Sequence, residues 1–209
     1  MAEVKKLIEG YKKFYKENFI TNNNNIFDDI QNSQNPKTLI ISCSDSRVDP
    51  AILTNAEMGD IFVVRNVANI VPPYQPEWNS KHGTSAALEF AVNYLGVKHI
   101  VVLGHSDCGG IKALLNNNID MDNKFSFITD WVKSHAEIKN KIPENIEDKY
   151  LFCEQEGIKL SINNLMTFPW IIEKVKKNEL KLHGWYFSIK DASLSILDDN
   201  KSVFNKIEV

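Results

Sequence analysis

The chain has 209 residues, 43% of them hydrophobic, with a formal net charge of -3 and a pI near 6.0. This composition supports a sizeable core, and the charge argues against the basic surface of a nucleic-acid-binding protein. No apolar run approaches the ~20 residues of a membrane span, and the first residues lack the apolar core of a signal peptide. The odd count of three cysteines argues against a disulfide framework. We therefore expect a cytoplasmic protein without nucleic-acid or membrane partners.

The first part of the chain has the pattern of an amphipathic helix. From about residue 3 to residue 19, apolar side chains recur at helical spacing and fall on one broad face. Four asparagines at 22–25 interrupt the pattern, which resumes from 26 to 30. Such a helix either folds back onto its own core or reaches onto another subunit, and the sequence alone leaves both possibilities open.

From residue 38 onward, strand-like and helix-like segments alternate. This alternation, with continuously apolar strands, predicts an α/β fold in which helices flank a mainly parallel β-sheet. No linker is long enough to divide the chain, so we expect a single domain over residues 1–209. The expected strands are 38–41, 60–64, 99–103 and 180–189, and the expected helices are 85–95, 109–115, 125–141, 146–165, 166–177 and 192–197.

Two short polar motifs follow two of these predicted strands. Cys43 comes directly after the first strand, and His105 follows the third, with Cys108 three residues further on. In an open α/β sheet, ligands bind beyond the carboxyl ends of the strands, where neighbouring strand ends meet. Two thiols and one imidazole suit Zn²⁺ with one coordination position left open. Gly109 and Gly110 allow the backbone to pass close to such a site.

Each motif alone is weak evidence. A cysteine after a buried strand is usually an inert core residue, and a lone His-x-x-Cys does not by itself indicate a metal site. Together, and flanked by Asp, Ser and Gly, the two motifs favour a metal site. Cys153 lies in a helix-like segment without such a partner, and we interpret it as structural. The remaining histidines are interpreted as surface or hydrogen-bonded core residues, and they are His82, His99, His135 and His183.

Arginine is rare in this chain, since Arg47 and Arg65 are its only examples. Arg47 lies two residues from Asp45, which in turn lies two residues from Cys43. A guanidinium can grip a carboxylate with two hydrogen bonds, which an ammonium cannot do. Asp45 could bind a metal, accept a hydrogen bond from its water, or have no role, and Arg47 could select among these.

The Cys-x-Asp-x-Arg motif at 43–47 and the His-x-x-Cys-Gly motif at 105–109 resemble those of the β-class carbonic anhydrases. The resemblance covers roughly residues 30–197. Further segments that fit the family are 60–74, 83–92 and 183–185.

The resemblance implies one Zn²⁺ per chain, bound by Cys43, His105 and Cys108. Asp45 and Arg47 would be the catalytic dyad. The implied activity is the reversible hydration of CO₂ to bicarbonate and a proton, by attack of zinc-bound hydroxide. Two alternatives stay open on the same scaffold. One is hydrolysis of the CO₂-like substrates carbonyl sulfide or carbon disulfide, and the other is a catalytically silent zinc scaffold.

The resemblance also implies that the active site lies between subunits. Gln34 and Phe62 would reach in from a neighbouring copy, so we expect a homo-oligomer, a dimer or a dimer-based tetramer or octamer. Residues 1–31 would then form a helical arm that packs on the neighbour. Phe90 stands where plant-type members have a tyrosine, and Ile40 stands where a bicarbonate-regulated subtype has a tryptophan. The implied substrate-pocket residues are Gln34, Phe62, Phe90 and Gly109.

Two thiolates cancel the formal charge of zinc, whereas three imidazoles would not. The zinc water is therefore expected to be less acidic than in a three-histidine site. We expect turnover to rise above neutral pH. The outgoing proton carrier is not identified by the sequence, and Tyr94 and His82 are candidates.

Overall fold

The structure is a computed structural model that describes residues 2–20, 30–76, 82–116, 126–198, 200 and 202–209. The chain divides into two compact units, residues 1–35 and 36–209. Each unit is described by itself. No helix in the described residues is both long and apolar enough to cross a membrane.

In the first unit, residues 2–20 form an amphipathic helix, as their spacing predicted. Helix α1 (Ala2–Tyr15) continues into the π-helical turn η1 (Lys16–Ile20). Neither element has a buried residue, and Leu7 and Tyr11 on the apolar face are 73% and 63% exposed. The expected turn at 22–25 lies outside the described residues, as does most of the segment 26–30.

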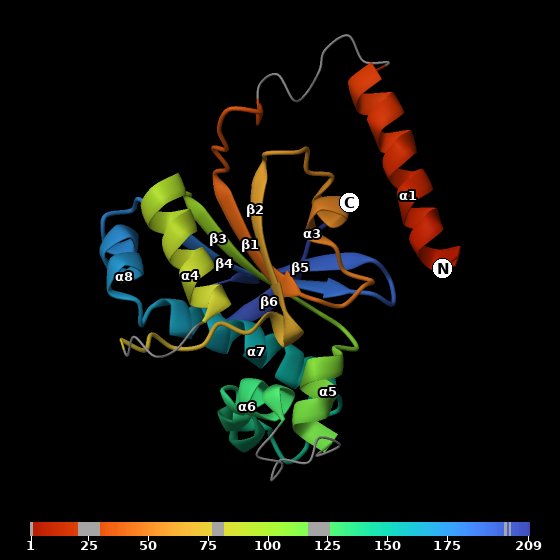
Figure 1. The fold of residues 1–209 in the computed structure, drawn as a ribbon. Helices are drawn as coiled ribbons and strands as arrows, with labels where there is room; N and C mark the ends of the chain where they lie inside the picture. The colour runs from red at the N-terminus through yellow and green to blue at the C-terminus, as the bar shows by residue number, and fades with distance from the viewer. Residues whose placement is uncertain (1, 21–29, 77–81, 117–125, 199, 201) are drawn as a thin grey trace. The chain divides into compact units, whose positions relative to one another are not determined.

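The second unit is built on a six-stranded sheet in the order β2-β1-β3-β4-β5-β6 (Figure 1). The first three pairings in this order are parallel, and the last two are antiparallel. The expected α/β class with a mainly parallel sheet is confirmed. The strands are β1 Thr38–Cys43, β2 Ile61–Asn66, β3 His99–His105, β4 Lys181–Ser188, β5 Ser193–Asp198 and β6 Val203–Lys206.

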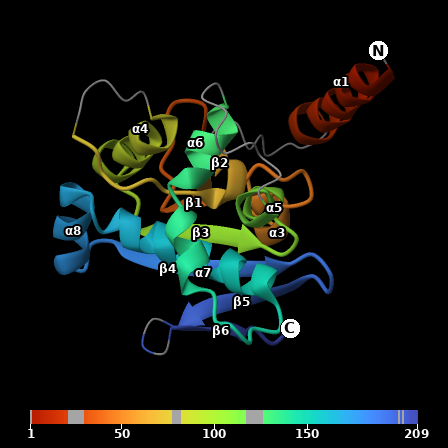
Figure 2. The ribbon, with the colours of Figure 1, turned by 90° about the horizontal axis from the view of Figure 1, so that it is seen from below.

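Helices and short turns connect the strands and cover the sheet. Figure 2 shows α7 running across one face, where it contacts β3 and β4. The elements are α3 Pro50–Thr54, α4 Gly83–Glu89, α5 Gly109–Asn116, α6 Phe127–Lys133, α7 Lys149–Leu165, α8 Pro169–Lys176, the 3-10 turns η2 Val67–Asn69 and η4 Ala136–Lys141, and the π-helical turn η3 Phe90–Leu95.

The alternation of side chains along β1 divides the core between the two faces of the sheet. Leu39 and Ile41 point to one face and belong to a buried cluster that includes residues of α4, α7 and α8. Ile40 points to the other face, where it clusters with Val48 and Val101. All of these side chains are at most 2% exposed, so β1 is buried on both sides. Its continuous apolar sequence is explained by this position.

Two expected helices are corrected by the structure. Residues 192–197 were expected to be helical, but β5 occupies them and pairs with β4. Ala192 has a φ of 54°, which does not fit a right-handed helix, and the following Ser-Leu-Ser-Ile alternates with the period of a strand. The helix expected over 125–141 is divided into α6 and η4 at the buried His135. Strand β6 had not been expected.

Candidate metal centre and active site

Three potential ligands meet at the carboxyl ends of two neighbouring strands. Cys43 is the last residue of β1 and His105 is the last residue of β3, not two residues beyond it as expected. Cys108 directly precedes α5. Because β1 and β3 are paired in parallel, their ends lie together. One ligand atom from each residue lies within 4.8 Å of the other two, and all three residues are buried.

The geometry of this cluster fits a tetrahedral metal ion. The Cys43 and Cys108 sulfurs are 4.0 Å apart, and two thiolates on a tetrahedral zinc with ~2.3 Å bonds would be about 3.8 Å apart. His105 Nδ1 is 2.8 Å from the Ser106 carbonyl oxygen. A proton on Nδ1 donates to that oxygen and leaves Nε2 with a free lone pair. His105 Nε2 is buried and has no hydrogen-bond partner within the described structure.

Ionisation of the two cysteine sulfurs also favours the binding of a cation at this site. The hydrogen bond with Cys108 is the main reason that the pKa of the Cys43 thiol lies below its usual value, in spite of burial. The nearby Cys43 sulfur and burial raise the pKa of Cys108. One thiolate thus suppresses ionisation of the other, and a cation between them would relieve this repulsion. The cluster could therefore hold a divalent metal with a fourth position open.

Glu154 on α7 supports the loop of residues 105–108, which carries two of the three potential ligands. Its Oε1 accepts a hydrogen bond from the Cys108 backbone N–H at 3.0 Å, and its Oε2 accepts one from the Tyr186 hydroxyl at 2.8 Å. The carboxylate is buried, and this burial raises its pKa. Sequence reasoning did not find Glu154, because its position in an ordinary helical segment gives no sign of a contact made 46 residues away.

Asp45 and Arg47 form the bidentate pair that their spacing suggested. Arg47 Nε and Nη2 donate to Asp45 Oδ1 and Oδ2 at 2.9 and 2.7 Å. These side-chain hydrogen bonds are the main reason that the pKa of Asp45 lies well below its usual value. Asp45 Oδ2 is also 4.0 Å from His105 Nε2. A charged carboxylate therefore lies beside the position that a metal would occupy.

Arg65, the second arginine, fixes the backbone of the same loop. From β2 it donates to the carbonyl oxygens of Cys43 at 3.0 Å, Asp45 at 2.7 Å and Val48 at 3.1 Å. It also forms an ion pair with Asp49 at 2.9 Å, the residue that caps α3. Arg47 thus holds a side chain, whereas Arg65 holds the main chain.

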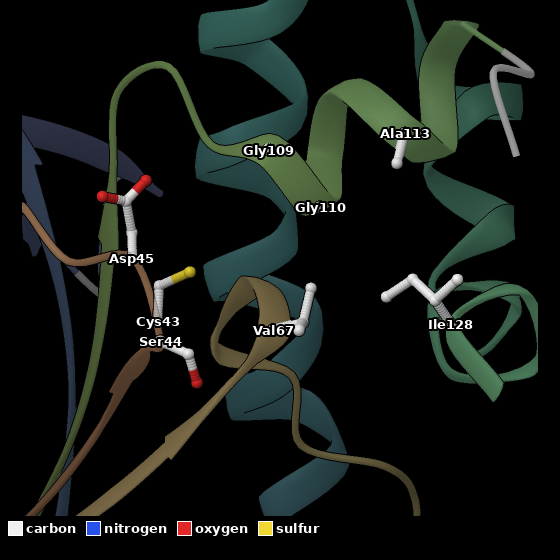
Figure 3. Close-up of a pocket in the computed structure, with 8 residues that line it drawn as sticks. All are labelled: Cys43, Ser44, Asp45, Val67, Gly109, Gly110, Ala113 and Ile128. Carbon is white, nitrogen blue, oxygen red and sulfur yellow. The ribbon is translucent and has the colours of Figure 1, made fainter. Parts of the chain in front are cut away.

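A cavity of about 360 Å³ opens beside the ligands (Figure 3). Its far wall is apolar and includes Val67, Ala113 and Ile128. Trp131 Nε1 donates to the Val67 carbonyl oxygen at 2.8 Å and ties α6 to this wall. The lining residues are Cys43, Ser44, Asp45, Val67, Gly109, Gly110, Ala113 and Ile128.

The structure brings only part of the predicted pocket together within one chain. Gly109 lines the cavity. Phe62 and Phe90 instead contact each other, with ring centroids 6.0 Å apart, and are not among the lining residues of this cavity. Phe90 is 42% exposed. Gln34 is an exposed residue of the first unit.

The surroundings of Cys153, His99, His135 and His183 fit the structural interpretation given to them. Cys153 is fully buried in the core. His99 Nδ1 and His183 Nε2 lie 3.1 Å apart, and the buried His135 is hydrogen-bonded to Ser161.

Comparison with known proteins identifies the family. A family model for carbonic anhydrase matches residues 38–194. The chain is 37% identical over 190 residues to β carbonic anhydrase 3 of Arabidopsis thaliana, covering 88% of this chain and 72% of that one. The solved structure of the β-carbonic anhydrase CcaA has a TM-score of 0.86 and 32% identity, covering 100% of this chain and 94% of that one. A tetrameric β-carbonic anhydrase of Sordaria macrospora has a TM-score of 0.67 and 31% identity, covering 94% of each chain.

The chain therefore belongs to the carbonic anhydrase family, whose members are lyases that hydrate CO₂. Within that family it is a member of the β class, as the two sequence motifs had indicated.

Proposed function

We propose that this protein catalyses the zinc-dependent, reversible hydration of CO₂ to bicarbonate and a proton. The observation that carries the proposal is the buried cluster of Cys43, His105 and Cys108, with an unpartnered imidazole nitrogen, beside the Arg47-bound Asp45. Cys43, His105 and Cys108 would hold one Zn²⁺. When bound, zinc supplies a Lewis acid that makes water nucleophilic near neutral pH.

The dyad orients the reacting water. Asp45 stays charged because Arg47 donates two side-chain hydrogen bonds to it. Its Oδ2 accepts a hydrogen bond from the attacking water and turns a lone pair of that water towards the substrate carbon. Arg47 keeps the carboxylate in this orientation. The apolar wall of Val67, Ala113 and Ile128 suits CO₂, which carries no charge.

The complete pocket is proposed to need a second copy of the chain. Phe62 and Phe90 are proposed pocket residues that do not line the cavity of their own chain, and Gln34 belongs to the other compact unit. We propose that Gln34 and Phe62 reach the site of a neighbouring subunit and that the helical arm packs on that subunit. The exposed apolar face of α1 supports this, as does the tetrameric relative from Sordaria macrospora.

The test is stopped-flow CO₂ hydration by zinc-loaded protein at about pH 8.5, followed with a pH indicator. Rapid, zinc-dependent acidification is expected. No acceleration with one zinc still bound per chain would contradict the proposal. The same protein would then be assayed with carbonyl sulfide and carbon disulfide, and inactivity on both would indicate a silent zinc scaffold.

The pH profile adds a second test. Because two of the ligands are thiolates, turnover is expected to rise from neutral to alkaline pH. A flat profile from about pH 6 to 9 would contradict this expectation.

A further inference from the structure

Arg47 is held by two carboxylates, of which only one was expected. Its Nε and Nη2 donate to Asp45, as described above. Its Nη1 donates to Asp107 Oδ2 at 2.9 Å, and its Nη2 also donates to the Asp107 carbonyl oxygen at 3.2 Å. The guanidinium therefore links the loop after β1 to the loop after β3.

The backbone of Asp107 adopts an unusual conformation where it makes this contact. Asp107 lies between two of the metal ligands and has a φ of 63°, in the left-handed region. Aspartate and asparagine tolerate this region better than most residues that carry a Cβ. Lys112 on α5 forms an ion pair with Asp107 Oδ1, so both carboxylate oxygens are engaged. The two oxygens have separate partners, Arg47 for Oδ2 and Lys112 for Oδ1.

The position of Arg47 decides what Asp45 can do. Asp45 Oδ2 lies 4.0 Å from the unpartnered His105 Nε2, and carboxylates are competent zinc ligands. If Arg47 moved away, Asp45 could turn to the metal and fill its open position. The Arg47 backbone N–H also holds Asp45 Oδ1, at 3.0 Å, but Oδ2, the oxygen that lies near His105, accepts from the Arg47 side chain. A second anchor that fixes the Arg47 side chain therefore also fixes Asp45 Oδ2.

We propose that Asp107 is a positioning residue that anchors Arg47 and thereby keeps Asp45 out of the metal coordination shell. The inference rests on the proposed function for its catalytic consequence. Arg47 and Asp107 are 44% and 50% exposed, and a single ion pair between side chains this exposed contributes little to stability. The consequence of losing Asp107 is therefore a change at the site, with little change in folding.

The test compares Asp107→Asn with Lys112→Met. Asparagine retains the shape of the side chain and tolerates the left-handed backbone, but it removes the charge that holds Arg47. Methionine at 112 removes the other ion pair of Asp107 and leaves its contact with Arg47. Three quantities are measured: kcat for CO₂ hydration, zinc bound per chain, and the visible absorption spectrum of the Co²⁺-substituted protein.

Asp107→Asn is expected to lower kcat on the order of 5-fold with zinc still bound one per chain. Its Co²⁺ spectrum should change as a carboxylate joins the metal. Lys112→Met should match the parent protein in all three quantities. A parent-like Co²⁺ spectrum for Asp107→Asn would overturn the proposal, and so would equal effects of both variants.

Two further variants make the result of this test decisive. In an Arg47→Ala background, Asp107→Asn should change the Co²⁺ spectrum no further, because Asp107 acts through Arg47. An additional change there would overturn the proposal. If Asp107→Asn does not fold, Asp107→Gly accepts the same backbone and takes its place. If the parent protein does not hydrate CO₂, the proposed function fails, while the Co²⁺ spectra still decide the role of Asp107.

Discussion

The two arginines act on the same loop in different ways, and conservative substitution should separate them. Arg47→Lys is expected to lower kcat/KM about 10-fold or more with zinc content unchanged, because one ammonium cannot replace two parallel hydrogen bonds to Asp45. Arg65→Lys is expected to lower the free energy of unfolding by about 1–3 kcal/mol, since Arg65 donates to three carbonyl oxygens.

Steady-state kinetics, zinc analysis and denaturant unfolding of both variants check this expectation. Equal losses of activity and zinc in Arg47→Lys would mean that Arg47 merely supports the fold.

Glu154 gives a second prediction at this scale. Glu154→Leu is expected to weaken zinc binding about 10-fold, because residues that orient metal ligands have effects of that size and the Cys108 N–H loses its buried acceptor. Tyr186→Phe is the matched control, since it removes the other bond of Glu154 and leaves the one to Cys108. The measurement is competition for zinc with a chelator. Similar affinities for Glu154→Leu and Tyr186→Phe would contradict the assigned support.

At the scale of elements, α5 packs against η2 through a glycine. A Cβ added at Gly110 would lie 2.8 Å from Ala68 Cβ and 2.8 Å from Val67 Cγ1, whereas one added at Gly109 would meet nothing within 4 Å. Gly110→Ala should therefore reduce the free energy of unfolding by about 1–3 kcal/mol, and Gly109→Ala should change it by less than about 0.5 kcal/mol. Urea unfolding measures the free energy of unfolding of the two variants, and equal values would contradict this close contact.

The junction between α6 and η4 makes stability depend on pH. His135 is fully buried and hydrogen-bonded to Ser161, and burial lowers its pKa to about 4. An unfolded histidine titrates near pH ~6.5, so below that pH the unfolded chain takes up the proton first. Stability from this residue is complete above about pH 6.5 and is lost as the pH falls towards 4, by up to about 3 kcal/mol. His135→Gln should flatten the decline in the free energy of unfolding over that range, and an unchanged slope would contradict the prediction.

The sequence predicts best those elements whose pattern of apolar residues matches the way they pack in the fold. β1 is buried on both faces, and the three residues at its centre, 39–41, are all apolar. The helix that begins with α4 ends at Gly96, which has the left-handed φ of 68° typical of a helix terminus. The segment at 193–198 could not be assigned as reliably, because six residues fit either a short helix or a strand. In the folded chain this segment pairs with β4, and that pairing makes it a strand.

At the scale of the whole molecule, assembly should depend on the apolar face of α1. Leu7→Glu with Tyr11→Glu is expected to dissociate the proposed homo-oligomer, because both side chains are exposed in the single chain and their change costs its fold little. Lys6→Ala with Lys13→Ala changes the net charge by the same amount on the opposite side of the helix and should leave the oligomer intact. Sedimentation velocity measures the oligomeric state of the two double variants, and identical profiles would contradict the role of this face.

The three potential metal ligands could be predicted from the sequence, whereas the residues that hold the surrounding groups in place could not. Cys43, His105 and Cys108 are chemically rare side chains at the ends of strands that a parallel sheet brings together, so their cluster follows from topology. Asp107 and Glu154 are common residue types whose contacts span 60 and 46 residues. Which way such side chains point depends on local backbone angles and on helix placement, which no short-range pattern specifies.

The placement of the ligands on two strands also bears on how the chain folds. Cys43 and Cys108 are 65 residues apart, and the segment between them carries the whole crossover from β1 through β2 to β3. Parallel pairing over such a distance is slow to form, since the loop must close before any contact is made. A metal ion retained by both thiolates in the unfolded chain would act as a cross-link, and the lost conformational entropy would raise the free energy of the unfolded chain by about 4 kcal/mol. The same ion would then bring the ends of β1 and β3 together early and favour their native register.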